Sequence, residues 1–374
     1  MHLTLFLNTI RNKFQQAGRR HIVSFEKINN RILPLDGDAM EAAWNQWNSI
    51  CKPIGSLGVL EDIVVQIAGI TGTAFYDISR RIVLAFCADN GVVAEGVTQC
   101  GQEVTLLVAE NMGRYASSVC QMARIANTNV MPIDMGMNAP GERVLDRHIA
   151  RGSGNIAHGP AMTYEQAVQA IEVGIDMVGQ VKEQGYGLVV TGEMGIGNTT
   201  TTTAVACALL GLDPGEVTGI GSGLSEEGMR CKVGAIQSAL EVNKPDPNDA
   251  LDVLAKVGGF DLAGIAGAFI GGALHRVPVM VDGVVSAVGA LIAARLCPAC
   301  RPFMIFSHAS AEPVFKQIVE ELDGKPIIYA GMRLGEGTGA VCLIPMIDMA
   351  LSLYSQGTSF DAIGVEAYDT ELVK

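Results

Sequence analysis

The chain has 374 residues, with 26 Lys and Arg against 39 Asp and Glu, so its net charge is −13. Such an acidic chain is not expected to bind nucleic acid or an anionic membrane, because both need a basic face. Hydrophobic residues make up 49% of the chain and glycine contributes 44 residues. This composition excludes disorder and is typical of a buried α/β sheet with many tight turns.

The chain starts with an apolar segment, MHLTLFLNTIRNKF, in which Leu3, Phe6, Leu7, Ile10 and Phe14 have helical spacing. Its basic residues follow the apolar part, whereas those of a secretory signal precede it. The pattern predicts an amphipathic helix that packs on the body of the protein or on a partner subunit. We expect no apolar run to span a bilayer, and GGFDLAGIAGAFIGGAL (258–274) is expected to be a buried helix.

Residues 1–75 read as mostly helical. Asp38 is expected to cap a helix that runs through Trp44 and Trp47, and a second helix is expected from about Leu57 to Ile70. Thr163 and Gln166 form a capping box at the start of a further helix. Residues 345–374 are expected to be helical and then frayed.

Short β-branched or aromatic runs alternate with these helical patterns, and each ends at a polar or glycine-rich turn. The predicted strands are Ile82–Cys87, Val130–Asp134, Leu188–Thr191, Val277–Val281, Phe303–Ser307 and Pro326–Tyr329. Helices between strands imply right-handed crossovers, so the fold class is α/β with a Rossmann-like, six-stranded parallel sheet flanked by helices.

Polar motifs follow five of these strands: ADNG, GEMGIGNTT, VDG, SHASAEP and LGEGTGA. In an open parallel sheet, ligands bind beyond the carboxyl ends of the strands. The five loops are therefore expected to meet at one edge and form a single site.

Two of the glycine-rich segments are candidates for binding an anion. GEMGIGNTT (192–200) can bring backbone N–H groups close to a phosphate, and Asn198 then opens a helix whose N-terminus favours negative charge. A tight turn without a ligand is the alternative. GIGSGLSEEG (219–228) is followed by Lys232, which is either a solvated charge or a point charge for the same phosphate.

Carboxylates are the other chemistry at this edge. Glu336 stands between two glycines in LGEGTGA and could act as a general base, the alternative being a glutamate that favours a helix N-terminus. Glu193 and Asp282 belong to equivalent loops, and several carboxylates around one cleft suit a reaction that develops positive charge at a sugar carbon. In SHASAEP, Ser310 can cap a turn or bind sugar or phosphate.

Metal and cofactor sites are not predicted. Cys297 and Cys300 form a lone C-x-x-C, which is a weak metal signal without a second pair. The 6 His are scattered without metal-ligand spacing. The 9 Cys are also scattered, mostly in apolar segments, which favours reduced thiols and a cytoplasmic location.

The loops, in this order, resemble nicotinate-nucleotide:5,6-dimethylbenzimidazole phosphoribosyltransferases (the CobT family). The similarity covers about residues 39–364. The matching stretches are KPIGSLGVLE (52–61), ADNGVVAEGVTQ (88–99), ARGSGNIAHGPAMT (150–163), GEMGIGNTT, KVGGFDLAGIAGA (256–268), VDG (281–283), SHASAE and MRLGEGTGA (332–340).

The resemblance implies a large α/β domain at 76–344 and a small helical domain. The small domain would combine the N-terminal segment 1–75, with an extension at 1–35, and the C-terminal segment 345–374. The resemblance also implies a homodimer with its active site near the subunit interface, although an identical partner and a paralogue both stay open.

The resemblance makes Glu336 the catalytic base. It places nicotinate mononucleotide at Glu193, Gly195, Gly221, Lys232 and Ser310, and we add Asn198 and Asp282 from the same loops. The acceptor base would be bound by Asp89, Gln99, Met194 and Leu334.

The implied function is transfer of phosphoribose from nicotinate mononucleotide to 5,6-dimethylbenzimidazole, giving nicotinate and an α-ribotide for the lower nucleotide loop of cobalamin. One alternative keeps the chemistry but uses adenine, another benzimidazole or a phenol as acceptor. A second is a nucleotide-binding regulator without catalysis. A NAD-dependent dehydrogenase is disfavoured because the full G-x-G-x-x-G is missing.

Overall fold

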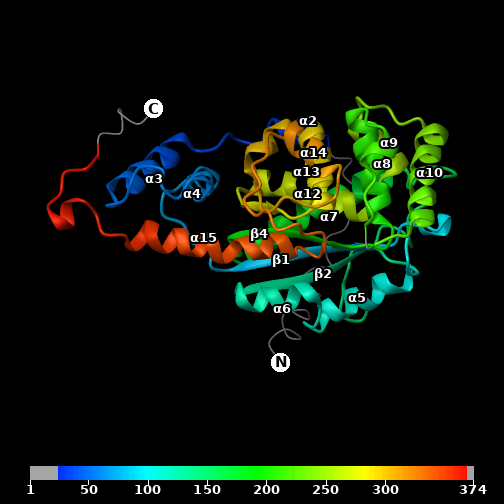
Figure 1. The fold of residues 1–374 in the computed structure, drawn as a ribbon, viewed down its shortest axis with the longest axis horizontal. Coiled ribbons are helices and arrows are strands. Elements are labelled where there is room, and N and C mark those ends of the chain that lie inside the picture. Colours follow the sequence, from blue (N-terminus) through cyan, green and yellow to red (C-terminus); the bar gives the residue numbers. More distant parts are fainter. Residues whose placement is uncertain (1–23, 222, 369–374) are drawn as a thin grey trace.

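The computed structural model describes residues 24–221 and 223–368, so the amphipathic helix predicted near the N-terminus lies outside the described residues (Figure 1). The helices are α2 Phe25–Asn29, α3 Gly37–Ser49, α4 Val59–Thr71, α5 Glu103–Gly113, α6 Ser118–Ile125, α7 Tyr164–Glu183, α8 Asn198–Leu210, α9 Pro214–Val217, α10 Glu226–Asn243, α11 Ala250–Val257, α12 Phe260–His275, α13 Val284–Leu296, α14 Phe315–Glu321 and α15 Thr338–Gln356. Three short 3₁₀ helices are η1 Gly91–Glu95, η2 Pro298–Phe303 and η3 Asp361–Ile363.

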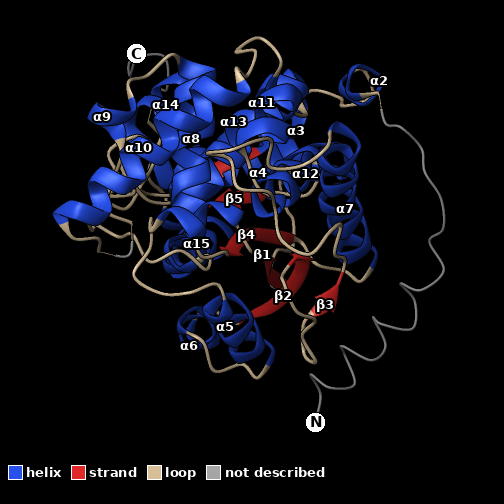
Figure 2. Ribbon diagram, turned by 90° about the vertical axis from the view of Figure 1, so that its right-hand side faces the viewer, coloured by secondary structure: helices blue, strands red, loops and turns tan. Residues whose placement is uncertain are grey.

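A six-stranded sheet forms the centre of the molecule. Its strands are β1 Arg81–Ala88, β2 Thr128–Gly136, β3 Leu145–Asp146, β4 Leu188–Met194, β5 Val279–Val281 and β6 Met304–Phe306. Their order is β3-β2-β1-β4-β5-β6, and every neighbouring pair is parallel (Figure 2). The chain order reverses between β1 and β4, which is the place where an open α/β sheet offers a crevice for a ligand. The predicted fold class is confirmed.

Five of the six predicted strands are confirmed, but the sixth is wrong. Residues 326–329 do not form a strand: a single bridge joins His308 to Ile328, and the N–H groups of Ile327 and Ile328 both donate to the Ser307 carbonyl oxygen. Tyr329 is exposed, so the chain leaves the sheet after this one pairing. The sixth strand is β3 instead, whose two residues are too few to produce a pattern in the sequence.

Helices cover both faces of the sheet. Ile82, Leu84 and Phe86 of β1 pack with α7, α12 and α13 on one face. Val83 and Ala85 point to the other face, where the helices are α5, α6 and α15 (Figure 2). The side chains of β1 are all buried because both faces are covered, as expected for a central parallel strand.

Small residues let α7 and α12 approach each other closely. A Cβ added at Gly267 of α12 would lie 2.9 Å from the Cα of Gly174 in α7 and closer still to the Ile171 carbonyl oxygen. Gly234 in α10 is a matched glycine in a helix with no atom within 4 Å of the added Cβ. The first contact is backbone against backbone, which cannot move aside like a flexible side chain.

We therefore expect the two glycines to respond to alanine with opposite signs. Gly267→Ala should lower the free energy of unfolding by about 1–3 kcal/mol through overpacking. Gly234→Ala should raise it by about 0.5–1 kcal/mol, because alanine is the better helix former. Urea unfolding of both variants measures the two changes. A Gly267→Ala protein as stable as the unsubstituted one would contradict this view of the α7–α12 contact.

The two ends of the described chain pack together beside the sheet. Trp47 of α3 is fully buried and its ring lies 5.0 Å, centroid to centroid and edge-on, from that of Tyr354 at the end of α15. The Cys51 N–H donates to the Thr358 carbonyl oxygen, and Phe360 N–H donates to that of Ser49. Figure 1 shows α3 and α4 lying over the C-terminal half of α15. The domain boundaries given above stay predictions.

The predicted caps are right in one helix and wrong by two residues in another. The capping box of Thr163 and Gln166 is present at the start of α7. In α3, however, Asp36 and not Asp38 is the cap, because its Oδ1 accepts the Ala39 N–H at 2.9 Å. The backbone N–H of Asp36 donates to the Gly69 carbonyl oxygen of α4, and this tertiary contact fixes where the helix begins.

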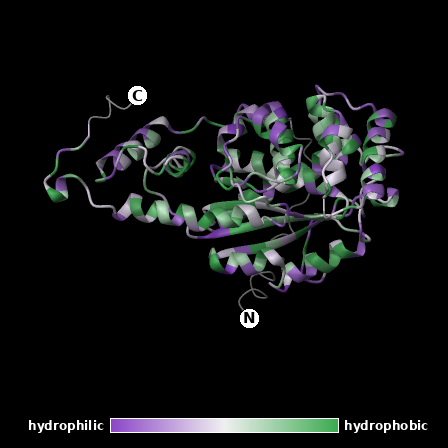
Figure 3. Cartoon of the chain, in the orientation of Figure 1, coloured by the Kyte–Doolittle hydropathy of each residue, from purple (hydrophilic) through white to green (hydrophobic). Residues whose placement is uncertain are grey.

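One helix among the described residues, α15, has the length and composition to cross a membrane, with a mean hydropathy of 1.4. It is coloured mostly as apolar in Figure 3. Half of it is buried inside the molecule, however. Leu343, Ile344 and Ile347 belong to the core on the face of the sheet that α5 and α6 cover. These contacts are those of a core helix. The segment 258–274 is a buried helix, α12, as expected.

Candidate active site

A cavity of about 240 Å³ opens at the carboxyl ends of the strands. Its walls come from the segments after β1, β4, β5 and β6 and from the loop before α15, so the predicted convergence of loops is present. Of the candidate residues, it is lined by Glu193, Met194, Gly195, Asn198, Gly221, Lys232, Asp282, Ser310, Leu334 and Glu336. The roles given to them in the sequence analysis stay predictions.

Two candidates lie outside the lining. Asp89 is buried directly after β1, where its Oδ2 accepts the N–H of Asn138 at 2.8 Å. Gln99 belongs to a segment whose other residues, Val97, Thr98 and Cys100, do line the cavity. The segment around Gln99 therefore reaches the cavity, and contact of Asp89 or Gln99 with an acceptor base stays a prediction.

The end of β4 supplies a carboxyl group to the cavity. Glu193 is the sixth residue of this strand, and the side-chain amide of Asn198, the first residue of α8, donates to its Oε2. Burial, followed by the nearby charge of Asp261, raises the pKa of Glu193 to about 8, against the opposing effect of the Asn198 hydrogen bond. At neutral pH the Glu193 carboxyl group therefore holds a proton and can donate a hydrogen bond.

A buried lysine forms the cationic part of the cavity. Lys232 of α10 has no exposed surface, and its Nζ donates to Thr199 Oγ1 at 2.9 Å and to the Gly219 carbonyl oxygen at 3.0 Å. Burial lowers the pKa of Lys232 to about 8, while the charge of Glu312 opposes the shift. The lysine thus joins the two glycine-rich segments.

Sequence reasoning missed two charged residues beside this lysine. Arg333 Nη1 donates to the Gly221 carbonyl oxygen at 3.1 Å, and the Gly221 N–H donates to Glu312 Oε1 at 3.1 Å. Both residues stand inside motifs that were singled out, MRLGEG and SHASAEP. Arg333 could have been found from its position, because it is a cation only three residues before Glu336 and few other cations stand near the glycine loops.

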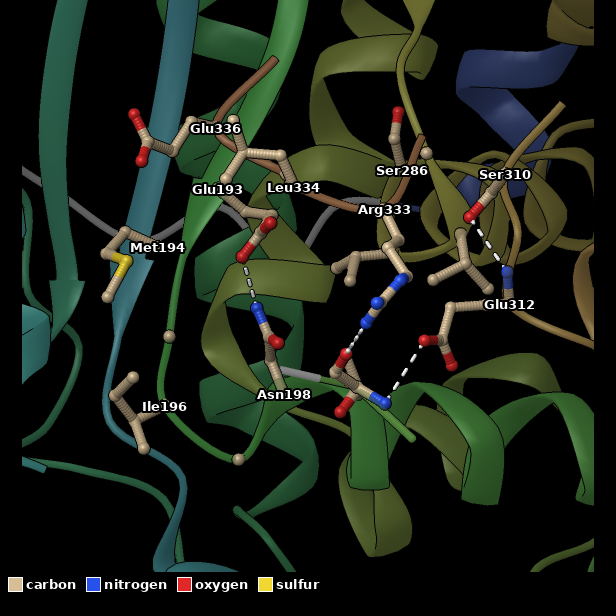
Figure 4. Close-up of a pocket in the computed structure, with 18 of the residues that line it drawn as sticks. Glu193, Met194, Ile196, Asn198, Ser286, Ser310, Glu312, Arg333, Leu334 and Glu336 are labelled. Atoms are coloured by element: carbon tan, nitrogen blue, oxygen red, sulfur yellow. Dashed lines mark hydrogen bonds between the residues drawn. The ribbon is translucent and has the colours of Figure 1, made fainter. Parts of the chain in front are cut away.

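Glu336 lies across the cavity from these charges. In Figure 4, Glu336 and Met194 are on one side, Arg333, Ser310 and Glu312 are on the other, and the Glu193–Asn198 pair lies between them. Glu336 is 9% exposed, and its Oε2 accepts the backbone N–H of Val119 at 3.0 Å. Val119 is near the N-terminus of α6, so one carboxylate oxygen is anchored to a helix on the same face of the sheet as α15.

The residue before Glu336 has to be glycine. Gly335 has φ +86°, a left-handed conformation, and a Cβ there would collide with the Glu193 carboxyl group. The absence of a side chain lets the Glu336 turn pass directly over β4. This contact places the two glutamates in the same cavity.

One group of possible metal ligands exists elsewhere among the described residues. The ligand atoms of Asp134, Asp146 and His148 lie within 4.8 Å of one another near β2 and β3. Asp134 already forms an ion pair with Arg151 at 3.0 Å, and none of the three residues lines the cavity. The C-x-x-C cysteines are likewise elsewhere, with Cys297 and Cys300 both buried around η2.

Comparison with known proteins gives a consistent result. A family model described as phosphoribosyltransferase matches residues 32–365. The chain is 44% identical over 350 residues to the nicotinate-nucleotide–dimethylbenzimidazole phosphoribosyltransferase of Ruminiclostridium cellulolyticum, a match that covers 92% of this chain and 99% of the relative. The enzyme of the same name from Clostridium acetobutylicum is 42% identical over 348 residues, with coverage of 92% and 99%.

A solved structure agrees with this match. The crystal structure of CobT from Thermus thermophilus superimposes with a TM-score of 0.82 at 35% identity, and the match covers 88% of this chain and 99% of that chain. Sequence similarity and fold similarity thus extend over nearly the same, almost complete, length. The chain belongs to the nicotinate-nucleotide–dimethylbenzimidazole phosphoribosyltransferase family.

Proposed function

We propose that this chain transfers the phosphoribosyl group of nicotinate mononucleotide to 5,6-dimethylbenzimidazole. The products are nicotinate and the α-ribotide of the base, which serves the lower nucleotide loop of cobalamin. The relatives named above carry this activity in their names, and the matches extend over almost the whole of each relative.

The observation that carries the proposal is the division of one cavity into two ends. Lys232 and Arg333 gather around the Gly219–Gly221 backbone at one end, whereas Glu336 is at the other. The first end suits a phosphate ester, because the buried ammonium of Lys232 and the guanidinium of Arg333 are cations that bind phosphate. The second end suits an acceptor that has to lose a proton.

The chemistry follows from this division. Nicotinate mononucleotide carries a pyridinium on C1′, so the C1′–N bond breaks with its electron pair returning to the nicotinate nitrogen. The unprotonated ring nitrogen of the benzimidazole forms the new bond to C1′ from the opposite face, which gives the α configuration. Glu336 takes the N–H proton from the other ring nitrogen. Holding both reactants in one cavity contributes up to roughly 7–11 kcal/mol in well-oriented systems.

The carboxyl groups that line the cavity suit the ribose. Positive charge develops at C1′ as nicotinate leaves, and the Glu336 carboxylate contributes negative charge to the surrounding wall. Glu193, with its raised pKa, and Asn198 supply hydrogen-bonding groups at the height of the sugar. Met194 and Leu334 offer apolar surface for a flat aromatic base.

The proposal includes a homodimer that works in the cytoplasm. Leu334 lines the cavity and yet is 57% exposed, so an apolar side chain at the site has room for a cover from a second copy. Light scattering on the purified protein tests the dimer, and a monomer at micromolar concentration would contradict it.

The experiment for the activity is direct. The purified protein is mixed with nicotinate mononucleotide and 5,6-dimethylbenzimidazole, and both products are separated by chromatography. The proposal expects nicotinate and the α-ribotide in equal amounts, with no nicotinate release when the base is omitted. Tight binding of the mononucleotide without turnover would instead indicate a regulator.

The lowered pKa of Lys232 predicts how the activity depends on pH. Because its pKa is lowered to about 8, the ammonium loses its charge as the pH rises above that value. We expect kcat/KM for nicotinate mononucleotide to fall about tenfold per pH unit above pH 8, since this ratio reports ionisations of the free enzyme.

Initial rates between pH 6 and 10 at saturating acceptor measure this profile. Lys232→Arg is the matched control, because a guanidinium stays charged throughout the range. Its profile should lack the decline above pH 8, whatever its absolute rate. A decline of the same shape in both proteins would assign the ionisation to another group, such as Glu193, whose pKa is also about 8.

A further inference from the structure

The turn that carries Glu336 has an unusual backbone. Gly335, Glu336 and Gly337 have φ values of +86°, +62° and +92°, so three consecutive residues are in the left-handed region. For a residue with a side chain, such as Glu336, this conformation is strained, because Cβ comes too close to the following carbonyl oxygen. The turn therefore needs contacts from outside itself to hold its shape.

Asp282 provides those contacts. It follows β5 directly and is 3% exposed. Its Oδ2 accepts the Gly337 N–H at 3.1 Å and its Oδ1 accepts the Ala340 N–H at 2.9 Å. Both oxygens thus bind the first turn of α15, immediately after Glu336, where a negative charge is favoured by the helix dipole.

Asp282 is itself held in place from β4 and α13. The backbone N–H of Asp282 donates to Ser286 Oγ at 3.1 Å, and Ser286 Oγ shares a hydrogen bond of 2.5 Å with Thr191 Oγ1. His308 Nδ1 is 3.9 Å from Asp282 Oδ1. All these residues are buried, so they hold the Asp282 carboxylate in one orientation. Both of its oxygens already accept backbone N–H groups.

We infer that Asp282 is a positioning residue, which sets the orientation of Glu336 by clamping the N-terminus of α15, and that it is not a ligand of the nucleotide. This inference replaces the nucleotide-binding role that the sequence suggests for Asp282, and it rests on the proposed function. The burial that raises the pKa of Asp282 to about 6 is compatible with a charged carboxylate at neutral pH.

The test begins with Asp282→Asn, which keeps the shape but turns one acceptor oxygen into an N–H₂ group facing a backbone N–H. The displaced turn should lower kcat by about 10²-fold, as small misplacements of reacting groups do. KM for nicotinate mononucleotide should change by less than about threefold, and so should its Kd from calorimetry. The reason is that the variant keeps every contact that the protein makes with the bound nucleotide. Ser286→Ala, which removes the acceptor of the Asp282 N–H, should cause a smaller loss of the same kind.

A matched control separates positioning from loss of a helix cap. Asp249 accepts the N–H groups of Leu251 and Asp252 at 3.0 and 3.1 Å and caps α11, which does not line the cavity. Asp249→Ala, which removes this cap, should lower the midpoint of urea unfolding without changing kcat.

A double variant supplies the readout that a purely structural role would not give. If Asp282 acts through Glu336, adding Asp282→Asn to a Glu336→Gln protein should leave kcat within about threefold, because residues that act as a unit are not additive. An additive loss in the double variant, or a loss confined to KM and Kd, would overturn the positioning role of Asp282. Neither result would contradict the proposed function. Absence of turnover in the unsubstituted protein would overturn both proposals.

Discussion

Glu336→Gln is expected to lower kcat by about 10²–10⁴-fold, the usual contribution of general-base catalysis. Glutamine keeps the size of the side chain and can still accept the Val119 N–H through its amide oxygen, but it cannot take the proton of the benzimidazole. The loss should therefore appear in the chemical step. Nicotinate release at saturating concentrations of both substrates measures it.

Binding separates this loss from a structural fault. Glu336→Gln should bind nicotinate mononucleotide with a Kd within about threefold of the unsubstituted protein, because the phosphate end of the cavity is unchanged. Glu320→Gln, an exposed position on α14, is the control for a change of one charge and should keep full activity. If Glu336→Gln turned over at the normal rate under saturating substrate, the acceptor would lose its proton to a different group.

Lys232→Met is expected to raise KM for nicotinate mononucleotide by about 10- to 150-fold, which corresponds to the 1.5–3 kcal/mol of a hydrogen bond to a charged group. Methionine keeps most of the buried stem of the side chain and removes the ammonium that joins Thr199 Oγ1 to the Gly219 carbonyl. The effect on kcat should be smaller, because the lysine binds the phosphate in the substrate and in the transition state alike.

A truncated donor shows whether the lysine acts on the phosphate. Nicotinate riboside lacks the 5′-phosphate, so it should bind the unsubstituted protein and Lys232→Met with similar Kd values in calorimetry. The difference between nucleotide and riboside should be large only when Lys232 is present. A variant that weakens both ligands equally would show that the lysine supports the shape of the cavity and does not contact the phosphate.

Much of this site could be predicted from the sequence because the motifs follow strands. Each predicted strand is a short β-branched or aromatic run that ends at a polar turn, and parallel strands place those turns at one edge. Glu336, Lys232 and the 192–200 turn are far apart in the chain, yet they line one cavity. The order of the loops was sufficient to expect this, without knowledge of any contact.

The missing parts depend on contacts that leave no pattern in the residues. Pro326–Tyr329 has the composition of a strand, but pairing is decided by the neighbour, and only Ile328 forms a bridge. The anchor of Glu336 is a backbone N–H of Val119, 217 residues away, and a backbone donor has no side-chain signature. Asp282 illustrates the same limit, since its position suggested a ligand while its two oxygens bind α15.

The most direct test is a crystal structure with the α-ribotide product bound. We predict that the phosphate contacts Lys232 and the Gly221 backbone, and that the ring nitrogen distal to C1′ lies within hydrogen-bond distance of Glu336. A product whose phosphate is remote from Lys232, or whose base points away from Glu336 in a catalytically active crystal, would contradict the proposed division of the cavity.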